Sequence, residues 1–290
     1  SGTVRFSDTV EVRDHAGVGL EAGISIHDQL ANSEVIFADT VQVRSTAAGL
    51  SSNGNGIFLA NNVANSSVSF LDNVTVDLTD QEAIFIDNIS GDVDFEGVTT
   101  VTNRLLEGIS INNSSGDITF GTASADRTEV NNELNSQNAA SEILGNTGTV
   151  RFSNAVITNA QGNVGRGAGF DIVDNIGVDP ITGDDIGLVR IIDMDVESVG
   201  GIGFFGLNNN EISTDDGEID TTGAAAVNIQ DSGINIHLEQ VNSSGSPDYG
   251  IRLVNTNRDQ KRTFLIQPNV TAATPGTGGV ISDAKGNGLD

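Results

Sequence analysis

Cysteine and tryptophan are absent from the 290-residue sequence, which also contains only four prolines and one tyrosine. Without cysteine, the chain cannot form disulfides, thiolate zinc sites or iron–sulfur clusters, and it has no cysteine nucleophile. Long apolar runs are also missing, because none approaches the roughly 18–20 residues that a membrane helix requires. The composition therefore predicts no membrane insertion of this segment.

Positive charge is scarce as well. The chain has 13 basic against 40 acidic side chains, which gives a formal net charge of −27 at pH 7. The phosphate backbone of nucleic acids attracts basic surfaces and repels acidic ones, so the charge argues against nucleic acid as a partner. Anionic membrane surfaces are disfavoured for the same reason.

The sequence does contain an internal repeat. An apolar residue, any residue and then phenylalanine recur at positions 4–6, 35–37, 68–70, 93–95, 118–120 and 150–152, with steps of roughly 25–33 residues. Two alternating valines follow several copies, such as Val41 and Val43 after Phe37. Alternation with period two is typical of strands, whereas helices have a period near 3.6.

A third pattern completes each repeat, namely a small residue followed by two alternating apolar positions. Clear copies begin at residues 23, 56, 83, 108, 169, 226 and 250, and weaker copies occupy 140–143, 203–206 and 279–282. The mean step is about 28 residues, and self-similarity at such a period indicates a solenoid.

Three short strands per repeat predict an all-β fold, a right-handed parallel β-helix of about ten three-strand coils with polar loop insertions. A β-propeller is the structural alternative, but its four-stranded units run to about 40 residues. Asparagines after the third pattern, such as Asn175 and Asn209, are expected to stack as a hydrogen-bonded ladder.

We interpret residues 1–290 as a single domain. Both ends lie inside the repeat pattern, so we expect a segment of a longer chain.

Two stretches depart from the pattern. Residues 126–145 lack period two and begin with Asp126-Arg127-Thr128-Glu129, which matches a capping box. The alternatives there are a long polar loop and a short helix. Residues 175–187, which contain Asp184 and Asp185, are expected to form a second protruding loop.

These repeats resemble the right-handed β-helix segments of large secreted bacterial surface proteins, among them autotransporter passenger domains and filamentous-haemagglutinin-like adhesins. Phe70-Leu71-Asp72-Asn73 matches the Phe-x-x-Asn motif of polymorphic outer-membrane proteins, although residues 37–40 lack its final asparagine. Gly200-Gly201-Ile202 is similar to that family's second motif, Gly-Gly-Ala-Ile/Leu/Val. By analogy of fold, the resemblance implies adhesion or display at a bacterial cell surface.

Carboxylates in pairs are the main candidates for chemistry. Catalysis by two carboxylates requires that they face one substrate, and neighbours within a strand point to opposite faces. Solvated acids are therefore the default interpretation, and calcium binding is the alternative because this cation takes several oxygen ligands from a turn. The candidate calcium ligands are Asp184, Asp185, Asp193 and Asp195. No other cofactor is expected.

No catalytic residue is assigned. The three histidines lie far apart in the sequence, and the Gly-His-Gly and Arg-x-Lys motifs of inverting β-helix glycosidases do not occur. Uronate lyases of this fold hold acidic polymers with positive charge, which this chain lacks. We therefore expect a protein that is not an enzyme.

One candidate binding surface is aromatic. The middle residue of the third strand points outward, and on consecutive coils it is Phe58 and then Phe85, with Phe205 at the same position later. Two stacked outward rings could hold a sugar face or a partner protein, unless a loop at residues 47–55 covers them.

Together these features predict a non-enzymatic structural or adhesive rod, extracellular or at a cell surface. Its expected partner is a glycan or a protein on a host or neighbouring cell. The alternative is a carbohydrate-active β-helix, that is, a polysaccharide lyase, a glycoside hydrolase or a tailspike-like glycan binder.

Overall fold

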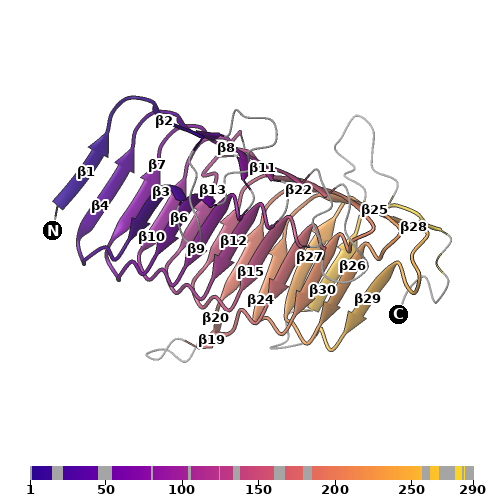
Figure 1. Ribbon diagram of the computed structural model, residues 1–290. Helices are drawn as coiled ribbons and strands as arrows, with labels where there is room; N and C mark the ends of the chain where they lie inside the picture. Colours follow the sequence, from indigo (N-terminus) through magenta and orange to yellow (C-terminus); the bar gives the residue numbers. More distant parts are fainter. Residues whose placement is uncertain are drawn as a thin grey trace.

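The computed structural model is a rod of stacked strands (Figure 1). It describes residues 2–14, 22–44, 54–79, 81–103, 106–123, 125–132, 138–159, 167–178, 185–256, 262–267, 278–282 and 284. The described residues form strands, turns and bends but no helix.

Three parallel sheets run along the rod. The first sheet contains β1 (Gly2–Phe6), β4 (Ser33–Phe37), β7 (Ser67–Phe70), β10 (Asp92–Phe95), β13 (Ile118–Phe120), β16 (Val150–Phe152), β21 (Leu188–Ile191), β24 (Glu211–Thr214), β27 (Ile234–Leu238) and β30 (Arg262–Ile266). The second sheet contains β2 (Val10–Arg13), β5 (Val41–Arg44), β8 (Val74–Thr79), β11 (Thr99–Asn103), β14 (Thr128–Asn132), β17 (Ala155–Asn159), β22 (Met194–Val199), β25 (Glu218–Thr222), β28 (Gln240–Ser244) and β31 (Ile281–Ser282). The third sheet contains β3 (Ala22–His27), β6 (Asn55–Ala60), β9 (Ile84–Asp87), β12 (Ile109–Asn112), β15 (Ser141–Leu144), β18 (Phe170–Val173), β23 (Phe204–Leu207), β26 (Val227–Gln230) and β29 (Ile251–Val254).

Each of the first nine coils contributes one strand to each sheet, and the last coil contributes described strands to the first two sheets. Within the three sheets, strands of neighbouring coils pair in parallel. The first two sheets have ten strands and the third has nine, which confirms the predicted parallel β-helix of about ten coils. We call the bend between the first and second sheets the first corner, that between the second and third sheets the second corner, and that leading to the next coil the third corner.

Phenylalanine repeats set the register of the first sheet. The rings of Phe6, Phe37, Phe70, Phe95, Phe120 and Phe152 form one stack. Neighbouring ring centroids lie 4.5–4.9 Å apart with interplanar angles of 3–8°. A shift by one residue would turn every ring to the solvent face, so this column fixes the pairing.

Asparagines at the third corner form the expected ladder. The backbone N–H of Asn146 donates to Oδ1 of Asn175 (2.9 Å), and the backbone N–H of Asn175 donates to Oδ1 of Asn209 (3.1 Å). All three side chains are buried. A second, exposed ladder runs beside them, in which Nδ2 of Asn88 donates to Oδ1 of Asn61 (2.8 Å).

The helix considered for residues 126–145 is wrong, because this stretch contributes β14 and β15 to the regular sheets. The carboxylate of Asp126 accepts hydrogen bonds from the backbone N–H groups of Thr122 (2.9 Å) and Ala123 (2.7 Å), which precede it, instead of capping a helix that follows. Val130 then packs into the core. Residues 133–137 lie outside the described part of the chain.

Two other stretches differ from expectation in detail. Residues 175–187 include an antiparallel hairpin of β19 (Gly177–Val178) and β20 (Asp185–Ile186), which lies at the edge of the rod in Figure 1. Residues 279–282 are not a copy of the third pattern, because β31 pairs with β28 in the second sheet.

Candidate functional site

Phe58 and Phe85 stack on the outer face of the third sheet, as predicted. Phe58 on β6 pairs in register with Phe85 on β9, and their ring centroids lie 5.6 Å apart with an interplanar angle of 30°. Both side chains are partly exposed. Ser25, which precedes Phe58 in the same column, is exposed. Most of the loop at residues 47–55, which was considered as a cover for the pair, lies outside the described residues.

The column that contains this pair continues along the rod through one outward residue per coil. In order it reads Phe58, Phe85, Ser110, Glu142, Asp171, Phe205, Asn228 and Arg252. Polar and acidic side chains thus separate Phe205 from the aromatic pair. The centre of the column is covered, since Ser110 is 1% and Asp171 is 4% exposed.

Carboxyl groups gather around this covered centre. Burial raises the pKa of Glu107 to about 7, and the negative charges of Glu142, Glu82 and Asp171 add to the rise. The hydroxyl of Ser110 lies 3.4 Å from Oε2 of Glu142. A carboxyl group that keeps its proton near neutral pH beside ionised neighbours can act as a general acid.

Sequence reasoning missed Glu107, although a signal existed. Glu82 and Glu107 each stand directly before the small residue of the third pattern on consecutive coils. The backbone N–H of Ala83 donates to the carbonyl of Glu107 (3.2 Å), which confirms that these positions stack. This position precedes the strand, so the alternation of the third pattern does not reach it.

Tyr249 lies near the C-terminal end of the same face and was also missed. The amide Nδ2 of Asn228 donates to its hydroxyl (3.0 Å), and the guanidinium of Arg252 lies 5.5 Å from its ring centroid. These contacts orient the ring beside a shallow hollow of about 210 Å³ lined by Gly200, Gly223 and Ala225.

Of the four aspartates predicted as calcium ligands, only Asp193 and Asp195 have described side chains, and the charge of Asp195 acts on the carboxyl group of Asp193. Asp184 lies outside the described residues, and Asp185 begins β20 in the hairpin. Asp193 lies at the first corner and Asp195 on β22, with strand β21 between them and the hairpin. Within the described ranges, no group of three or more Asp, Glu or His side chains is placed to hold a metal ion. Calcium binding stays a prediction, tested by thermal unfolding in chelator and in millimolar calcium.

Asp193 lies near acidic residues of the next two coils, Asp216 and Glu239. Partial desolvation raises the pKa of its carboxyl group, and the charges of Asp216 and Glu239 raise it further. Both Asp193 and Asp216 line a groove of about 380 Å³ at the first corner. The other lining residues are Thr122, Ala123, Arg151, Ser153, Ile192 and Asp215.

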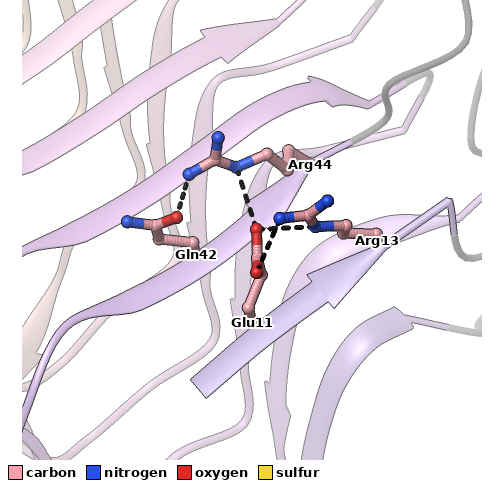
Figure 2. Close-up of polar contacts among 4 residues, drawn as sticks. All are labelled: Glu11, Arg13, Gln42 and Arg44. Atoms are coloured by element: carbon pink, nitrogen blue, oxygen red, sulfur yellow. Dashed lines mark hydrogen bonds and ion pairs between the residues drawn. The ribbon is translucent and has the colours of Figure 1, made fainter. Parts of the chain in front are cut away.

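Arginines elsewhere on the rod pair with carboxylates of the chain. Figure 2 shows Glu11 between two of them: Nε of Arg13 lies 2.7 Å and Nε of Arg44 lies 3.8 Å from its Oε1. The hydrogen bond from Arg13 lowers the pKa of Glu11, and Arg44 also donates to Gln42. Further ion pairs join Arg127 to Glu129 and Arg190 to Asp215. These arginine side chains are therefore already paired with carboxylates, whereas binding of an acidic polymer would require unpaired positive charge.

Comparisons of the chain with protein-family models, curated proteins and solved structures found no significant match. The described part of the chain also has no helix of the length and apolarity needed to cross a bilayer. The functional argument therefore depends on the geometry of the rod itself.

Proposed function

We propose that this chain is a non-enzymatic structural and adhesive rod, a segment of an extracellular or cell-surface protein that binds neutral glycans of a host or neighbouring cell. The observation that carries the proposal is the partly exposed stack of Phe58 on Phe85. The resemblance of the repeats to bacterial surface adhesins supports the same role by analogy of fold.

Charge selects the kind of glycan. A surface with a formal net charge of −27 repels uronate or sialylated chains, whereas the apolar face of a neutral sugar can pack on an aromatic ring without any ion pair. Successive coils of a parallel sheet are about 4.8 Å apart, so two rings present a continuous platform along the rod.

The test is a double variant, Phe58→Ser with Phe85→Ser, titrated by calorimetry against neutral oligosaccharides first selected on a glycan array. Each aromatic contact contributes about 0.5–1.5 kcal/mol, so affinity should fall about tenfold or more. Phe205→Ser, in the same column beyond Glu142 and Asp171, is the matched control and should bind as the wild type does. If the double variant binds glycan as the wild type does, the binding face lies elsewhere. If the double variant fails to fold, the two rings are core residues and not a binding surface.

A carbohydrate-active enzyme is the second candidate function, and Glu107 is the observation that favours it. Glycoside hydrolysis uses one protonated carboxyl group as the acid and a second carboxylate as the base or nucleophile. Glu107 has the raised pKa expected of the acid, and the carboxyl groups of Glu142 and Asp171 contribute to that rise. Reducing-sugar release from neutral and acidic polysaccharides should be absent under our proposal. If reducing sugar is released and the substitution Glu107→Gln abolishes this release, the protein is a hydrolase and the proposed non-enzymatic function is wrong.

A further inference from the structure

The groove at the first corner lies where adjacent coils have corners of unequal length. Residues 121–127 connect β13 to β14, whereas two residues, Ser153 and Asn154, connect β16 to β17. Ile192 and Asp193 make an equally short corner between β21 and β22. Residues of the longer corner and of its shorter neighbours line the hollow of about 380 Å³. This volume lies within the range of small-molecule sites.

The wall of the groove is held in place before any ligand enters. Asp126 binds the backbone N–H groups of Thr122 and Ala123, as described above, and Oγ of Ser153 donates to the carbonyl of Gly121 (2.6 Å). On the opposite side, the backbone N–H of Gly217 donates to Oδ1 of Asp216 (2.9 Å). Binding would therefore require little ordering of the protein.

The groove carries charge of both signs. Arg151 on β16 pairs in register with Arg190 on β21, and Asp215 neutralises Arg190 through a contact of 2.7 Å between Nη2 and Oδ2. The Nε atom of Arg151 is buried and has no hydrogen-bond partner within the described residues. A buried donor without a partner is unfavourable, so an oxygen acceptor at this position would be stabilising.

Asp193 and Asp216 form the acidic side. Their charges repel each other, which is one cause of the raised pKa of Asp193, and an ammonium group between them would relieve this repulsion. A metal ion fits less well, because Arg151 lines the same groove. A purely cationic ligand would leave Arg151 unused, and a purely anionic one would face two carboxylates.

We propose that this groove binds a small zwitterion of the free amino-acid class, whose ammonium group contacts Asp193 and Asp216 and whose carboxylate pairs with Arg151. Ile192 and Ala123 supply apolar surface for a short aliphatic side chain. The site is distinct from the aromatic platform, because it lies at the first corner and not on the outer face of the third sheet.

The experiment compares three matched probes by isothermal calorimetry on the whole protein at pH 7: L-valine, isobutylamine, which lacks the carboxylate, and isovalerate, which lacks the amine. We expect valine to bind at least about tenfold more tightly than either fragment, because each fragment loses one charge-assisted contact. Arg151→Gln and Asp193→Asn should each weaken valine binding at least about tenfold. Asp92→Asn, at an exposed position on β10, is the control and should bind valine as the wild type does.

Protonation of Asp193 removes its attraction for the ammonium group. Valine affinity should therefore fall as pH drops through the pKa of Asp193, and the fall should be smaller in Asp193→Asn. The proposal is wrong if valine does not bind at millimolar concentration, or if isobutylamine binds as tightly as valine. The second result would mean that the acidic rod attracts any amine. Unchanged melting temperatures of the two variants exclude misfolding as the cause of lost binding.

Discussion

On the outer face of the third sheet, a side chain that points away from the core can still be buried. Ser110 points outward between Phe85 and Glu142, yet it is 1% exposed, and Asn228 in the same column is 4% exposed. Removing ionisable groups from water favours their neutral forms. At the covered centre of this column, burial accordingly raises the pKa of the Glu107 carboxyl group to about 7.

Glu107 should make the stability of the protein depend on pH. Its pKa of about 7 lies above the ordinary value of 4.5 for a glutamate, so the folded state binds this proton more tightly than the unfolded state does. Stability should therefore fall as pH rises through this window, by roughly 3 kcal/mol. Urea unfolding of Glu107→Gln measures the effect, since the variant should exceed the wild type in stability at pH 8 by about that amount.

The control for this comparison is Asp8→Asn, at an exposed position of the first corner. It should keep the pH dependence of the wild type. If Glu107→Gln shows the same fall in stability between pH 4.5 and 7 as the wild type, Glu107 is not the group that titrates in this window.

Single residues of the candidate site were predictable to different degrees. Phe58 and Phe85 occupy equivalent places in a visible repeat, so their stacking followed from register alone. Glu107 stands outside the three strand patterns, and its raised pKa depends first on burial and then on the charges of Glu142, Glu82 and Asp171. The groove at the first corner is lined by residues of several coils whose corners differ in length, and residue spacing does not give how these corners pack together.

At the scale of elements, the asparagine ladder joins coils where the strands end. Asn175 accepts from both the backbone N–H and the Nδ2 of Asn146, and its own Nδ2 donates to the carbonyl of Ile143 (3.0 Å). The residue is 0% exposed. Buried amide groups that lose their partners are left unsatisfied, so the ladder is sensitive to a break at its middle.

Asn175→Ala should therefore destabilise the protein by about 2–4 kcal/mol, because it removes several buried hydrogen bonds and leaves the donors of Asn146 without their acceptor. Chemical denaturation measures the change. Asn88→Gly is the matched control on the exposed ladder, since glycine tolerates the positive φ of 53° at that position, and it should change stability by less than about 1 kcal/mol. Equal losses at both sites would contradict the assignment of the buried ladder as the stronger one.

Elements with strong period-two patterns were predictable, and those with weak patterns were not. The phenylalanine repeats place β1, β4, β7, β10, β13 and β16 in one sheet. In β14 the inward positions are Thr128 and Val130, so only one of them is apolar and the local capping-box pattern competes with the strand. Pairing with β11 and β17 decides the outcome, and that pairing is a tertiary effect.

At the scale of the whole molecule, the parallel fold places like charges next to each other. Asp195 pairs in register with Glu218, and Glu197 with Asp220, on the outer face of the second sheet. Burial raises the pKa of Glu218, and the charges of Asp195 and Asp220 raise it further. The arginine–carboxylate pairs of the described chain lie at exposed positions, where such pairs contribute little stability.

The rod should consequently become more stable as salt is added. Raising sodium chloride from about 20 mM to about 0.5 M shortens the Debye length from roughly 20 Å to roughly 4 Å, which screens repulsion between neighbouring coils more than it weakens the few ion pairs. We expect the melting temperature to rise by several degrees, measured by circular dichroism at pH 7. The double variant Asp195→Asn with Glu218→Gln removes one repelling pair, so it should melt higher than the wild type at low salt and gain less from added salt. A melting temperature that falls with salt would mean that ion pairs, and not repulsion, dominate the electrostatics of this acidic rod.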